Sequence, residues 1–217
     1  MHELFFRDDP ERTDIDDLKE AGIDPVLFET MLRFLYTEDF APDFDTEVNA
    51  FEMLKLANKY GATYLKMLLE SRILESGNLF NVDSAIDVAL FADDHSCAQL
   101  LEAASDLLAK RIAKYMDDPN WEKVEKSAAI MSEIERATKS GNDNRKGLDS
   151  KSVAQLRNRA IELDLDADGT RGMLIAVVKS GLESISSSRR AKCADASSIA
   201  LLTVANDKNV GHSHYNQ

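Results

Sequence analysis

The segment that most constrains the fold of this chain is residues 24–37, which read DPVLFETMLRFLYT. Its apolar residues recur at helical spacing, and they are Phe28, Met31, Leu32 and Leu35. Glu29 and Arg33 lie on the opposite side of the predicted helix. Asp24 and Pro25 are typical of a helix start, because an aspartate accepts from free amides and proline tolerates the first helical position. The segment therefore predicts a short amphipathic helix with one buried face.

The same periodicity continues after Pro42, which forces a loop. Apolar spacing predicts further helices over residues 48–60, 64–73, 81–95 and 96–116. Gly61 suits the left-handed position after a helix, and Ser96 with Gln99 has the spacing of a capping box. At most one or two short strands are expected, before Gly22. The predicted fold class is mainly α.

Composition and charge restrict the function. The chain has 44% hydrophobic and 30% charged residues, which is typical of a soluble globular protein, and its net charge is −13. Residues 1–52 carry 16 acidic and 4 basic side chains, so this part repels polyanions, whereas residues 145–182 carry 7 basic and 5 acidic ones. No apolar run approaches the roughly 18 residues of a membrane span. We expect a protein of the nucleus, the cytoplasm or both, without membrane contact.

The wording of several segments resembles one family. Residues 24–37 are similar to the DPxxFxxMLxFLYTG text of the BTB (POZ) fold, and residues 57–61, ANKYG, resemble its AADKYG signature. Residues 81–116 resemble the helix pair that follows BTB domains, and the chain as a whole resembles the speckle-type POZ class. The resemblance implies the C-terminal, helical part of a BTB domain at residues 1–78 and a BACK-like helical (3-box) extension at residues 79–140.

The first half of the BTB fold is absent from the sequence, so the resemblance implies a fragment or a misplaced start. In the family that half carries much of the dimer interface, and dimerisation is therefore not expected here. The resemblance implies a substrate adaptor that binds a cullin 3 type ubiquitin-ligase scaffold and an unknown protein substrate. It places candidate partner-binding residues at Phe5, Phe6, Glu11, Tyr36, Leu107 and Lys110.

A second unit is predicted at residues 148–182. Ser152 and Gln155 repeat the capping-box spacing, and two apolar helical stripes flank Gly169. This text resembles a SAP motif, a helical hairpin that commonly binds DNA. The resemblance implies weak nucleic-acid contacts through Arg157, Arg159, Thr170 and Arg171. Three aspartates in the turn disfavour phosphate, so a protein-binding hairpin is the favoured alternative. Residues 183–217 read as a disordered tail.

Other kinds of site receive little support. Asp164, Asp166 and Asp168 match the first half of a calcium-binding loop, but its twelfth position is Ile175, which cannot be the bidentate ligand. His95 has no second ligand or nucleophile at a matching spacing. We expect no catalytic residues, metal or cofactor. The alternative function is a nuclear nucleic-acid-binding or transcription-associated protein acting through the SAP-like motif, and a third is a fragment without a partner.

Overall fold

The computed structural model describes residues 22–40, 44–140 and 147–187. These residues are mainly helical and contain no strand, which confirms the predicted fold class. The strands expected before Gly22 lie outside the described residues. Within the described ranges, no helix is both long enough and apolar enough to cross a membrane.

The first described helix, α3 (Pro25–Thr37), begins as its sequence predicts. Asp24 accepts a hydrogen bond of 2.8 Å from the backbone amide of Val26, and Pro25 occupies the first turn. The predicted buried stripe needs one correction. Phe34 is buried, whereas Leu35 is 39% exposed. The helix is therefore turned about its axis so that Phe34, and not Leu35, faces the core.

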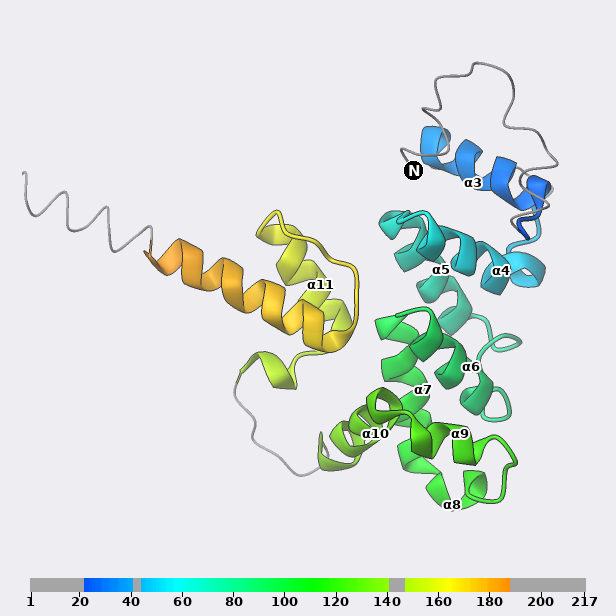
Figure 1. The fold of residues 1–217 in the computed structure, drawn as a ribbon, viewed down its shortest axis with the longest axis vertical. Helices are drawn as coiled ribbons and strands as arrows, with labels where there is room; N and C mark the ends of the chain where they lie inside the picture. The colour runs from blue at the N-terminus through cyan, green and yellow to red at the C-terminus, as the bar shows by residue number, and fades with distance from the viewer. Residues whose placement is uncertain (1–21, 41–43, 141–146, 188–217) are drawn as a thin grey trace, which may run out of the picture.

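Two antiparallel helix pairs follow in chain order (Figure 1). Helices α4 (Thr46–Lys59) and α5 (Thr63–Glu75) are joined at Gly61, whose positive φ of 64° fits the predicted helix end. Helices α6 (Ala85–Asp94) and α7 (Ala98–Lys110) form the second pair. The predicted start at Asn81 is wrong, because the Asn81 side chain instead accepts from the amides of Asp83 and Ser84 and holds a turn before α6.

Three further helices complete this helical bundle: α8 (Ile112–Tyr115), α9 (Trp121–Lys126) and α10 (Ala128–Ser140). Helix α10 packs on α7, and α9 packs on α6. One continuous apolar core runs through the bundle from Ile23 to Ile134. That core crosses the proposed boundary at residues 78 and 79 without a break, and the division into two domains there stays a prediction.

The remaining described residues form a hairpin beside α5 and α7 (Figure 1). The hairpin comprises η1 (Leu148–Ser150), α11 (Val153–Glu162) and a helix that covers the described residues 171–187. The capping box predicted at Ser152 and Gln155 is present, with both of its hydrogen bonds at 3.2 Å. Apolar clusters centred on Leu156 and Val178 hold the two helices together.

Candidate protein-interaction surfaces

The six candidate partner-binding residues do not gather in one place. Phe5, Phe6 and Glu11 lie outside the described residues. Tyr36 is 88% exposed in the last turn of α3, at one end of the bundle (Figure 1). Leu107 packs partly buried against the main core, and Lys110 is exposed at the C-terminal end of α7. The described candidates therefore occupy separate parts of the bundle, and they stay predictions.

The outward face of α3 has the chemistry of a contact surface. Val26, Glu29, Arg33 and Tyr36 follow one another along it and are all exposed. An exposed tyrosine presents a large apolar ring with a polar end, and tyrosine is enriched among the residues that dominate protein–protein binding. This face can therefore receive a partner without rearrangement of the core beneath it.

The start of α7 differs from the sequence expectation. The capping box predicted at Ser96 and Gln99 is wrong, because Ser96 has a positive φ of 54° and Cys97 is the residue before the helix. The first free amides of α7 are instead satisfied by a distant side chain. Glu70 of α5 accepts hydrogen bonds from the backbone amides of Gln99, at 2.9 Å, and Leu100, at 3.2 Å. A carboxylate at a helix N-terminus is also favoured by the helix dipole.

The second oxygen of Glu70 binds the hairpin. Arg157 of α11 donates to it at 2.6 Å, and both side chains are almost fully buried. Arg157 also donates to the Gln99 side chain at 3.2 Å, while its Nε has no hydrogen-bond partner. A residue predicted to face phosphate is thus enclosed between the hairpin and the bundle.

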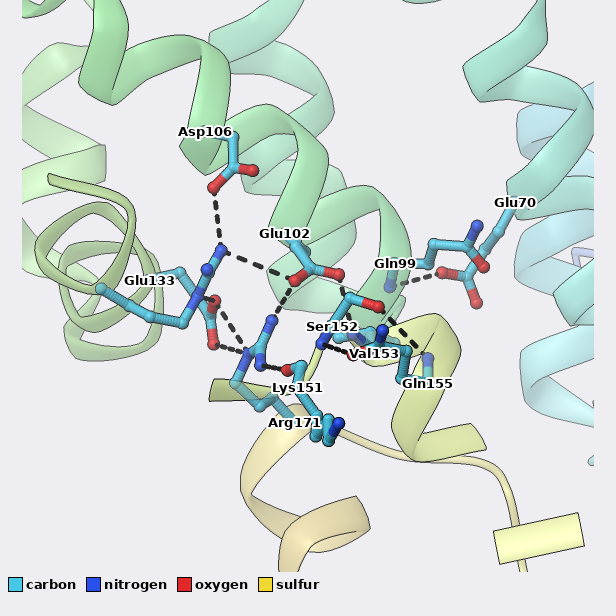
Figure 2. Close-up of polar contacts among 11 residues, drawn as sticks. Glu70, Gln99, Glu102, Asp106, Glu133, Lys151, Ser152, Val153, Gln155 and Arg171 are labelled. Atoms are coloured by element: carbon cyan, nitrogen blue, oxygen red, sulfur yellow. Dashed lines mark hydrogen bonds and ion pairs between the residues drawn. The ribbon is translucent and has the colours of Figure 1, made fainter. Parts of the chain in front are cut away.

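Arg171, at the start of the second hairpin helix, lies in a second cluster of carboxylates (Figure 2). Its guanidinium donates to Glu102 of α7 and lies 2.9 Å from an oxygen of Glu133 in α10. The other oxygen of Glu102 accepts 2.9 Å from the Val153 amide, at the start of α11. Arg136 donates 2.6 Å to Glu133 and balances the charge of this cluster.

A third contact joins the turn of the hairpin to the bundle. Lys66 is 1% exposed, and its Nζ donates to Asn58 at 2.8 Å and to Asp168 at 2.9 Å. Asp168 therefore binds an ammonium group. The part of the chain that the structure describes contains no group of three or more histidine, cysteine or acidic side chains arranged to hold a metal ion.

The two remaining nucleic-acid candidates are arranged differently. Arg159 is on the exposed side of α11 and pairs with Glu162 at 2.5 Å. The hydroxyl of Thr170 accepts 3.4 Å from the Met173 amide and caps the second hairpin helix. The four candidates therefore do not present one free basic face.

Two titratable groups near the start of α7 have shifted pKa values. Burial, reinforced by the charge of Glu70, raises the pKa of the Cys97 thiol to about 12, so this cysteine is an unreactive core residue. Burial and the charge of Lys55 lower the pKa of His95. Its ring packs on Phe91 with centroids 4.5 Å apart, which is a structural position.

Comparison with known proteins finds sequence similarity to TD and POZ domain-containing proteins. It is 28% identical to TD and POZ domain-containing protein 1 of Mus musculus over 107 residues, which are 49% of this chain and 28% of that protein. It is 30% identical to TD and POZ domain-containing protein 5 of Mus musculus over 99 residues, 46% of this chain and 28% of that protein. The chain is related to POZ domain-containing proteins. TD and POZ domain-containing protein 1-like, also of Mus musculus, is 28% identical over 110 residues, 51% of this chain and 29% of that protein.

The matched part spans less than a third of the length of these POZ relatives. No protein-family model matches the chain. The relationship agrees with the POZ resemblance of residues 24–37 and 57–61, whereas the speckle-type class and the SAP-like motif stay predictions.

Proposed function

We propose that this chain is a protein-interaction adaptor that presents a bound target protein to a cullin 3 type ubiquitin ligase. The observation that carries the proposal is its relationship to POZ domain-containing proteins over about half of its length. The exposed face of α3, with Tyr36 at its end, supplies a surface for such contacts. The chemistry belongs to the ligase, and the adaptor contributes by holding two proteins close together.

Capture of the N-terminal region of cullin 3 by the full chain tests the proposal. We expect binding that is weakened several-fold by Tyr36→Ala and by Lys110→Glu, since each changes the exposed side chain of a candidate partner-binding residue. Lys139→Glu, on α10, is a matched charge reversal that should leave capture unchanged. Circular dichroism checks that each variant keeps the helicity of the natural chain.

Absence of capture by this chain, and by a version extended upstream, would remove the cullin part of the proposal. Equal capture by all three variants would instead place the cullin contact elsewhere on the surface.

A further inference from the structure

The contact between the hairpin and the bundle contains few apolar residues, unlike the apolar core of the bundle and the apolar clusters of the hairpin. The main core contains only residues of the bundle, from Ile23 to Ile134. The hairpin's own clusters include just two residues of the bundle, Ala98 and Met67. Little apolar surface of the bundle therefore contributes to docking, and the hairpin resembles a separate small unit placed on a finished surface.

Charged side chains make most of the specific contacts. The bundle contributes a row of carboxylates, and the hairpin contributes the arginines that pair with them. We call this surface the arginine-binding face, and it consists of Glu70 of α5, Gln99 and Glu102 of α7, Glu133 of α10 and the small Ala98. Two separate guanidinium positions on one face specify both the position and the direction of the bound helices.

The carboxylates are oriented by the bundle itself. Glu70 is fixed by the two amides of α7 that it caps, and those hydrogen bonds do not involve the hairpin. Glu133 is fixed by Arg136 at 2.6 Å, and Arg136 also binds Asp106 at 2.8 Å. The face therefore does not require the hairpin for its geometry, which is the property of a preformed binding site.

The balance of energies favours a contact that can be exchanged. Taking an arginine and a glutamate out of water costs about as much as their attraction returns, so a buried pair contributes selectivity more than net affinity. When the hairpin leaves, Arg157 leaves with it, and Glu70 keeps the Gln99 and Leu100 amides as hydrogen-bond donors, so the carboxylate is not left without a partner. A competing helix with the same charges can therefore replace the hairpin at little net cost.

We propose that the arginine-binding face is a docking surface for an arginine-bearing helix of a partner protein, and that the hairpin occupies it as an intramolecular competitor. The occupant in this structure defines the chemistry, namely one arginine directed between Glu70 and Gln99 and another between Glu102 and Glu133. A small residue at position 98 permits close helix approach. The inference extends the proposed adaptor role, since it describes a surface for the target protein.

Two full-length variants test docking between molecules. The first, Arg157→Met with Arg171→Met, keeps the arginine-binding face and weakens its own hairpin. The second, Glu70→Gln with Glu102→Gln, keeps the hairpin arginines and weakens the face. We expect the fluorescently labelled first variant to bind the second, because an intact face meets an intact hairpin. Fluorescence anisotropy measures the binding.

Two controls make the assay specific. The natural chain, whose hairpin is already docked, should bind the labelled variant at least tenfold more weakly than the second variant does. A chain that carries all four substitutions should not bind. Absence of binding by the second variant, or equal binding by the chain with four substitutions, would overturn the proposal.

Hydrogen exchange of the natural chain gives a second measurement that needs no variant. Amides of α11 and of residues 171–182 should exchange together through an opening that leaves α6 protected. Exchange of the hairpin only upon unfolding of the whole bundle would also overturn the proposal. Neither experiment contains cullin, so a failure here leaves the cullin capture result unaffected, and the reverse holds too.

Discussion

The two partners of the buried pair between Glu70 and Arg157 should have unequal effects when each is removed. Glu70→Ala deletes the acceptor for two amides of α7, and loss of a helix cap costs typically about 1 kcal/mol. That loss remains after the hairpin has left. We therefore expect the free energy of unfolding of the bundle to fall by about 1–2 kcal/mol in this variant.

Arg157→Met leaves the cap of α7 in place. If the hairpin can leave the bundle, Glu70 regains water, and the free energy of unfolding of the bundle should fall by less than about 0.5 kcal/mol. If the pair is instead an obligatory part of one core, an unpaired buried carboxylate should cost about 3–5 kcal/mol. The two cases differ enough to be separated by urea unfolding.

Trp121 is the single tryptophan of the chain and is buried in the bundle, so its fluorescence reports on the bundle rather than on the hairpin. Glu162→Ala is the matched control on α11, because it removes the exposed partner of Arg159 and should change stability by less than about 0.5 kcal/mol. Equal losses of several kcal/mol in Glu70→Ala and Arg157→Met would refute the idea of a releasable hairpin.

Three further predictions concern other parts of the chain. Burial lowers the pKa of His95 in the folded chain, so the unfolded chain takes up the proton first as the pH falls below 6.5, and the stability of the fold should decrease there. Thermal melts should therefore show a fall in melting temperature from about pH 7.5 to about pH 5.5, and this fall should be smaller for His95→Gln. Gly172→Ala should stabilise the hairpin by up to about 0.5–1 kcal/mol, since an added Cβ meets open space, whereas Gly181→Ala places its Cβ 2.5 Å from Leu165 and should destabilise it; hydrogen exchange of the hairpin separates the two. The natural chain should bind duplex DNA no more tightly than about 10⁻⁴ M at physiological salt, and sub-micromolar binding in an anisotropy titration would contradict this.

Local signals in the sequence were sufficient for the elements that they specify. Asp24 and Pro25 start α3, Gly61 ends α4, and the capping box at Ser152 starts α11, because each of these depends on residues a few positions apart. The rotation of α3 about its axis depends on tertiary contacts that the sequence pattern does not contain. Adjacent apolar residues at positions 34 and 35 fit a helical stripe almost equally well, and only the tertiary contacts select Phe34.

Long-range contacts account for what the sequence did not predict. The spacing of Ser96 and Gln99 is that of a capping box, yet the acceptor for α7 comes from Glu70, on another helix. Nothing local distinguishes that glutamate from exposed ones nearby. One signal was present in α11, where Arg157 follows Val153 and Leu156 at helical spacing and so lies at the edge of the buried face.

The basic residues of the second unit have a different role in the structure from the one that their number in the sequence suggests. The second unit has more basic than acidic residues, which by itself suggests an anionic ligand. In the structure its Arg157 and Arg171 pair with glutamates of the acidic bundle, and its Asp168 pairs with Lys66. Positive and negative side chains of the hairpin therefore each meet an opposite charge on the bundle. They include Asp168, which the sequence suggested would repel phosphate. Such complementarity selects a partner and an orientation, and here it selects the chain's own bundle.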